Sequence, residues 1–181
     1  MRPFMVSPLM GFGLAPSAQT PPERCTWASE VDLLPVATGG GYASITAGRD
    51  RWRFRVVAAA VNIPKSFVPE GWEDARTRAQ ALLVDRYLRP GFVGPWVGGG
   101  LERWDENLRL ERSLERVRLR SLQATLGAGW VFDLGRGFTL NPWVAVHQRI
   151  AGDRQAAAGQ AICRPAPLQV EASVKVGYTF H

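Results

Sequence analysis

The sequence predicts an all-β protein: an eight-stranded, antiparallel, up-and-down transmembrane β-barrel with a polar lumen filled by side chains. Three observations predict it. Apolar and polar residues alternate along most of the chain, short turns alternate with long polar connections, and aromatic residues gather beside the short turns. Successive residues of a strand face opposite sides of a sheet, so a period of two indicates strands with one apolar and one polar face. Tight turns at one end and longer loops at the other are typical of bacterial membrane barrels.

The clearest alternation lies in the last segment, 168–180. Its even positions are Leu, Val, Ala, Val, Val, Tyr and Phe, whereas its odd positions are polar or small. At thirteen residues this segment is long for an ordinary strand. The same pattern predicts further strands at 40–47, 51–60, 79–88, 95–104, 121–132 and 140–147, with a hairpin rather than a helix across 107–122.

The connections and the first strand complete the count. Short turns are expected at 48–50, 89–94 and 133–137, and long connections at 62–78, around 105–116 and at 150–167. Seven strands follow from residue 40 onward, and an even number is needed for closure. Segment 29–36 can supply the eighth strand, with Val31 and Leu33 facing outward, Glu30 and Asp32 facing inward, and Pro35 shortening its end.

Composition excludes several classes of protein. The 181 residues are 46% apolar and 21% charged, which favours a single folded domain. The longest apolar run, Val56 to Val61, is too short for a membrane-spanning helix. Two cysteines and two histidines are too few for a metal-centred site, and no cofactor is expected. The net charge of +6 raises nucleic acid as a partner, but acids interleave the arginines and no nucleic-acid-binding motif occurs.

The N-terminal segment differs from the rest. Residues 1–24 combine an early positive charge, an apolar stretch and small residues, so they read as a signal-like or disordered segment followed by a linker, and the barrel is expected over 25–181. No lipoprotein motif precedes Cys25. We expect Cys25 at the periplasmic end and Cys163 in an outer loop, too far apart to form a disulfide.

The alternation from about Ser29 to Phe180, the turn rhythm and the ending Val176-Gly177-Tyr178-Thr179-Phe180 resemble the small eight-stranded outer-membrane barrels of Gram-negative bacteria, the group of OmpX and the OmpA membrane domain. The resemblance implies an outer-membrane location, a monomer and recognition of the last strand by the barrel-assembly machinery. Gly177 departs from the usual spacing, and His181 follows the aromatic residue that usually ends the chain.

Within this fold the charged side chains are expected to fill the lumen as a salt-bridge network, because buried charges must be paired. Its predicted members are Glu30, Asp32, Arg51, Arg53, Arg55, Asp85, Glu102, His147, Arg149, Glu171 and Lys175. Which residue of the adjacent pairs Asp85/Arg86 and Glu102/Arg103 faces inward is left open by the pattern.

Aromatic side chains near the short turns are expected to form a belt at the periplasmic membrane interface. Its predicted members are Trp52, Phe54, Trp130, Phe132, Phe138, Tyr178 and Phe180, and Tyr87, Phe92 and Trp96, which also lie beside turns, are expected to join them. Near the opposite rim, Arg103, Arg109, Arg118 and Arg120 are candidate contacts for lipopolysaccharide phosphates.

The predicted function is a structural or interaction role at the cell surface, without catalysis. One alternative is a lipid A-modifying barrel enzyme that uses His147, but the serine that such deacylases carry two residues away is replaced by Arg149. A further alternative is a soluble lipocalin-like binder of a small ligand, in which the apolar faces would point inward.

Overall fold

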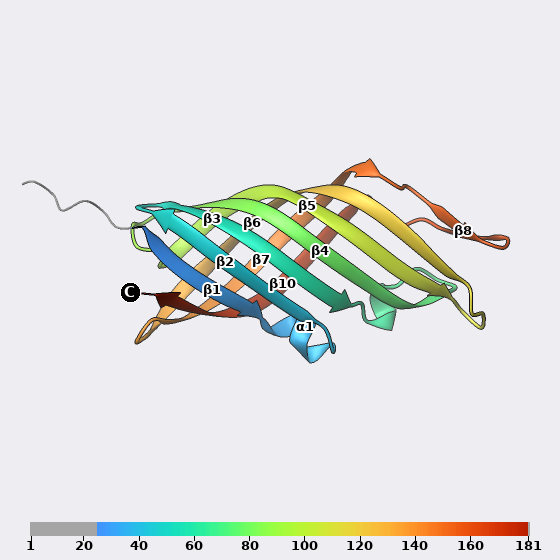
Figure 1. Cartoon of the computed structure of the whole chain (residues 1–181), viewed down its shortest axis with the longest axis horizontal. Coiled ribbons are helices and arrows are strands. Elements are labelled where there is room, and N and C mark those ends of the chain that lie inside the picture. The colour runs from blue at the N-terminus through green and yellow to red at the C-terminus, as the bar shows by residue number, and fades with distance from the viewer. Residues whose placement is uncertain (1–24, 181) are drawn as a thin grey trace, which may run out of the picture.

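The computed structural model describes residues 25–180, which form a closed antiparallel barrel of eight strands in the order β1-β10-β7-β6-β5-β4-β3-β2 (Figure 1). The predicted fold class is therefore confirmed. The barrel strands are β1 (Thr26–Asp32), β2 (Gly41–Arg49), β3 (Trp52–Asn62), β4 (Trp72–Tyr87), β5 (Gly94–Leu110), β6 (Arg116–Gly135), β7 (Phe138–Gly152) and β10 (Leu168–Phe180). The smaller elements are α1 (Leu33–Ala37), η1 (Lys65–Phe67), β8 (Ala156–Ala158) and β9 (Ala161–Cys163).

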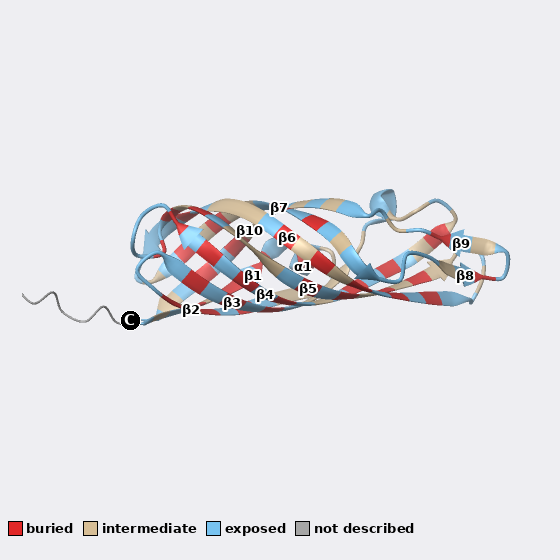
Figure 2. Ribbon diagram, turned by 90° about the horizontal axis from the view of Figure 1, so that it is seen from above, coloured by how far each residue is buried: buried red, intermediate tan, exposed pale blue. Residues whose placement is uncertain are grey.

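The apolar residues of the alternating pattern lie on the outside of the barrel. Val56, Leu126 and Val170 keep 59%, 73% and 69% of their surface exposed, and burial alternates along each strand in Figure 2. An apolar outer surface is opposite to what a soluble ligand-binding barrel requires, because such a barrel turns its apolar faces to the ligand. Among the described residues no helix is both long and apolar enough to cross a membrane.

The short turns all lie at one end of the barrel, here called the turn end, and the long connections lie at the loop end. The first turn consists of Asp50 and Arg51, with a φ of 56° at Asp50. It lies one residue later than predicted, since β2 continues to Arg49 and pairs there with Trp52. In the third turn both Arg136 and Gly137 have positive φ, the geometry of a tight hairpin that follows strand twist.

The long connections are shorter than predicted, because the central strands continue beyond their apolar segments. β4 begins at Trp72 rather than at 79, and β5 and β6 form a hairpin that turns only at residues 111–115. In these extensions the outward positions are mainly charged and the inward positions are mainly apolar or small, so the polarity of the alternation is reversed although the strand continues. The third connection contains the β8–β9 hairpin.

The predicted first strand 29–36 is only partly correct. β1 runs from Thr26 to Asp32, and α1 begins directly after it. The Asp32 carboxylate accepts a hydrogen bond of 3.1 Å from the backbone N–H of Leu34 and so caps the helix. Pro35 is tolerated because it lies in the first turn of the helix. Leu33 therefore belongs to the helix rather than to an outward strand position.

The loop end has an apolar core of its own. Trp72, Leu108, Val117, Leu119 and Cys163 are buried together where β8 and β9 fold against the extended strands. Burial raises the pKa of the Cys163 thiol, which keeps the side chain neutral. Neither described cysteine forms a disulfide.

We predict that Gly100→Ala destabilises the barrel by about 2 kcal/mol through overpacking. A Cβ on Gly100 would lie 2.1 Å from the carbonyl oxygen of Leu82 on β4, so the two strands would have to separate. Gly41→Ala is the matched control, because a Cβ there meets nothing within 4 Å. Urea unfolding of the detergent-folded protein measures both variants, and equal stability of the two would contradict this account of the close approach.

Candidate functional site

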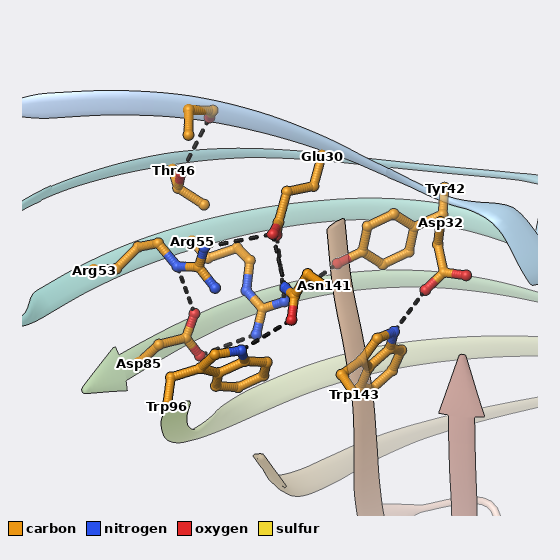
Figure 3. A network of polar contacts seen from close by, with 11 residues as sticks. Glu30, Asp32, Tyr42, Thr46, Arg53, Arg55, Asp85, Trp96, Asn141 and Trp143 are labelled. Atoms are coloured by element: carbon orange, nitrogen blue, oxygen red, sulfur yellow. Dashed lines mark hydrogen bonds and ion pairs between the residues drawn. The ribbon is translucent and has the colours of Figure 1, made fainter. Parts of the chain in front are cut away.

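A network of buried ion pairs lies in the lumen near the turn end (Figure 3). Arg53 and Arg55 of β3 each place a guanidinium nitrogen 3.0 Å from Asp85 of β4. Arg53 also lies 3.4 Å from the carboxylate of Glu30 on β1. Because all four side chains are almost completely buried, each charge depends on these partners rather than on water.

Neutral donors complete this network. Asn141 donates to Glu30 at 2.8 Å and accepts from the indole N–H of Trp96 at 3.0 Å. Asp32 accepts a bond of 2.8 Å from the indole of Trp143. The hydroxyl of Ser173 also donates to Asp32. Bonds from β3, β7 and β10 therefore converge on the two carboxylates of β1.

Lys175 is the third cation of this region. Its ammonium lies 3.8 Å from the ring centroid of Trp143 and 5.2 Å from that of Tyr42. An ammonium over an aromatic face is attracted by the ring quadrupole. Together the six charged groups, which we call the turn-end network, have equal numbers of acids and bases. They are Glu30, Asp32, Asp85, Arg53, Arg55 and Lys175.

A second group of polar side chains lies midway along the lumen. His147 of β7 has Nδ1 3.0 Å from the hydroxyl of Thr125 and 3.5 Å from the carboxylate of Glu102. Its Nε2 lies 3.4 Å from the carboxylate of Glu171 on β10. The ring of Trp104 packs 5.1 Å from the imidazole, and its indole donates to Glu102 at 2.7 Å. We call these five residues the mid-barrel cluster.

Most of the predicted lumen residues lie on the inner face, including Asp85 and Glu102 of the two undecided pairs, whereas Arg86 and Arg103 face outward. Arg149 faces inward and pairs with Glu106 at 2.9 Å. Arg51 was predicted wrongly: it is exposed, because the turn consists of residues 50–51. Sequence reasoning missed the inward indoles of Trp104 and Trp143, although each occupies the inward phase of its strand.

Aromatic residues near the turn end divide into two groups. Tyr87, Phe92 and Trp96 are buried inside the barrel with Val131, because Tyr87 and Trp96 lie on the inward phase and the turn carries Phe92 back into the opening. Their predicted place in the outer belt was therefore wrong, whereas the other predicted belt residues face outward. They are Trp52, Phe54, Trp130, Phe132, Phe138, Tyr178 and Phe180.

The outward face of the extended strands β4–β6 carries a concentration of arginine. Beyond the apolar outer positions Leu101 and Leu122 the next outward residue is arginine, and on β4 Gln80 lies between Leu82 and Arg78. Arg78, Asp105 and Arg120 are cross-strand neighbours. The arginines that define this outer arginine face are Arg76, Arg78, Arg103, Arg109, Arg116, Arg118 and Arg120.

Three acids partly neutralise this face. Arg118 donates to Asp105 at 2.6 Å, and this hydrogen bond lowers the pKa of the Asp105 carboxyl. Arg109 contacts Glu73 at 3.2 Å and Asp74 at 2.7 Å. Seven arginines against three acids leave a positive excess on one side of the barrel.

A cleft of about 940 Å³ opens on this face beside the connection that contains η1. Arg76 and Arg78 line it together with Lys65, and neither arginine has an ion pair with a described residue. The sequence does not predict either arginine as a site residue, because the expected strand begins at 79 and 62–78 is assigned to a long connection. The alternation of Arg76 and Arg78 with Thr77 and Ala79 was the available signal.

Within residues 25–180, no group of three or more histidine, cysteine, aspartate or glutamate side chains could hold a metal ion.

Comparison with known families finds no matching family model, and no curated protein matches in sequence. Among solved structures, the fold is similar to that of Neisserial surface protein A, an eight-stranded outer-membrane barrel. The match has a TM-score of 0.53 and 14% identity, and covers 86% of this chain and 94% of that protein.

We predict that Asp85→Ala destabilises the barrel by about 3–5 kcal/mol, because Arg53 and Arg55 both lose their closest partner and remain buried. Glu111→Gln is the control: Glu111 forms an exposed pair with Lys65, and its loss should cost less than about 0.5 kcal/mol. Urea unfolding in detergent measures both. Similar losses in the two variants would show that the turn-end network is not a determinant of stability.

Proposed function

We propose that this protein is an outer-membrane barrel with a closed lumen, and that its outer arginine face binds the phosphate groups of lipopolysaccharide. The observation that carries the proposal is the position of the seven arginines, beyond the apolar outer positions of the same three strands. An apolar band flanked by aromatic residues is the outer surface that a bilayer requires. The arginines then lie at the level of lipid phosphates, on the side opposite the aromatic belt.

Arginine chemistry supports this ligand. A guanidinium is planar and can donate two parallel hydrogen bonds to one phosphate, and it is less strongly hydrated than an ammonium. Arg76, Arg78 and Arg103 have no acidic partner among the described residues, so their donors are free for a ligand. The lipopolysaccharide contacts expected from the sequence, Arg103, Arg109, Arg118 and Arg120, all lie on this face, although Arg109 and Arg118 are engaged by acids.

The interior supports a role without transport or catalysis. Tyr87, Phe92 and Trp96 fill the turn end, the turn-end network fills the next level, and an apolar core fills the loop end. The His147 imidazole is buried in the lumen rather than presented to the outer surface, where a lipid A-modifying enzyme would need it.

The closed lumen predicts that the reconstituted barrel conducts no steady ion current in a planar bilayer. The ion pairs of Asp85 with Arg53 and Arg55 are the barrier. Stable single-channel steps in the unmodified protein would contradict closure. Current that appears only after Asp85→Ala would identify the network as the closing element.

Lipopolysaccharide binding is tested with the triple variant Arg76→Gln, Arg78→Gln and Arg103→Gln. Each arginine near an anionic lipid surface contributes on the order of 1 kcal/mol, so we expect roughly 10- to 100-fold weaker binding in a low-salt titration. A triple variant at the turn end, Arg51→Gln, Arg89→Gln and Arg136→Gln, changes the net charge equally and should bind normally.

The ligand itself supplies a second control. Enzymatically dephosphorylated lipopolysaccharide should bind the unmodified protein as weakly as intact lipopolysaccharide binds the Arg76, Arg78 and Arg103 variant. Equal binding of both ligands, or equal loss in both triple variants, would refute phosphate recognition by the outer arginine face.

A further inference from the structure

The wall of the barrel is not closed by strand pairing along its whole height. β1 pairs with β10 only from Trp27–Phe180 to Asp32–Lys175. Within the described residues, the first half of β10, Leu168 to Val174, pairs with β7 alone. We call this gap between β10 and the β2–β3 side the seam. An unpaired strand edge exposes backbone donors and acceptors, which are costly to leave unsatisfied in lipid.

The helix α1 occupies the base of the seam, partway along the barrel (Figure 1). Asp32 anchors its start, since the same carboxylate caps the helix and accepts bonds from Trp143 and Ser173. Asn62 of β3 anchors its end by donating to the carbonyl oxygens of Thr38 and Gly39 at 3.1 and 3.0 Å. The helix is therefore held at both ends and forms the lower boundary of the unpaired part of the seam.

The outer border of the seam is apolar. Leu33, Leu34 and Val36 of α1 are exposed, and Leu168 and Val170 of β10 are exposed beside the gap. If the barrel spans the membrane as proposed above, these side chains contact lipid chains. An alkyl chain that lies along α1 would stay among apolar side chains and lipid while its head reaches the lumen.

The inner border of the seam leads to the mid-barrel cluster. Glu171 lies on the seam strand, faces inward and keeps 33% of its side chain exposed. His147 lies on the next strand and is only 2% exposed. Its Nε2 faces the Glu171 carboxylate at 3.4 Å and its Nδ1 faces Glu102 at 3.5 Å, so the imidazole holds both carboxylates from the buried side and leaves the exposed part of Glu171 open to the seam.

The charges of the cluster select a cation. Glu102 and Glu171 face a single imidazole, so the cluster is negative even when His147 is protonated. The nearby guanidinium of Arg149 is engaged by Glu106 at 2.9 Å. The indole ring beside the imidazole, from Trp104, adds an aromatic face of the kind that attracts ammonium groups.

We propose that the seam admits an amphiphile with an ammonium head from the surrounding lipid, with the head bound by the Glu171 carboxylate and the alkyl chain lying over α1. The ammonium donates its hydrogen bond to the Glu171 carboxylate, which is one-third exposed on the seam side. This site rests on the proposed membrane location but not on lipopolysaccharide binding, because the outer arginine face lies on β4–β6.

Dodecylamine is a suitable probe, with dodecanol as the uncharged comparison of equal chain length. Equilibrium dialysis of the folded protein in a nonionic detergent should give one bound dodecylamine per chain, and at least 10-fold weaker binding of dodecanol. Glu171→Gln should weaken dodecylamine binding at least 10-fold, whereas Glu171→Asp should restore part of it. Glu115→Gln removes an exposed acid in the β5–β6 turn and should have no effect.

The seam is tested separately with amines of increasing chain length. The affinity for the amine should rise with its chain length in the unmodified protein. Leu34→Glu, which places a charge on the exposed face of α1, should remove that rise. Heat-dependent gel mobility checks that each variant is a folded barrel. Equal binding of dodecanol, or unchanged binding in the folded Glu171→Gln variant, would overturn the proposal.

The two proposals fail independently. The Arg76, Arg78 and Arg103 variant should bind dodecylamine normally, and Glu171→Gln should bind lipopolysaccharide normally. Loss of amine binding in the arginine variant would place the amine outside the seam and overturn the inference.

Discussion

Ring closure is the constraint on which the structure depends. A sheet whose first and last strands meet has no free edge, so its backbone groups are satisfied without water. Here the closing strand β1 is among the shortest of the ring, with seven residues. It compensates with side chains, because Glu30 and Asp32 receive bonds from β3, β7 and β10. Closure thus combines a short backbone ladder with a buried polar network.

The buried charges follow from the same requirement. An eight-stranded barrel has an interior just wide enough for side chains, and the outer face is reserved for apolar residues. Polar residues therefore have to point inward and must find partners there. The turn-end network achieves this with three acids and three bases, whereas the mid-barrel cluster keeps an excess of acids. The difference separates a part that stabilises the fold from a part whose charges are left for a ligand.

The sequence predicts this architecture wherever one strand face is apolar. The alternation in 121–132 and 168–180 identified strands and their outward phase. It did not place Arg76 and Arg78 in a strand, because beyond the apolar band the outward face is charged and the polarity of the alternation is reversed. α1 was missed because the helix is determined by one cap, from Asp32, rather than by a periodic pattern. Arg51 was misplaced because a shift of the turn by one residue is invisible to alternation.

The unequal height of the barrel wall has a consequence for its surroundings. β1, β2 and β3 have 7, 9 and 11 residues, whereas β5 and β6 have 17 and 20. The apolar outer residues of β5 and β6 end at Leu101 and Leu122, so the additional length of these strands stands clear of the apolar band as a one-sided parapet. If the barrel spans a bilayer as proposed, this projection shields one flank of the molecule from bulky neighbours above the membrane surface and leaves the β1–β3 flank accessible to them.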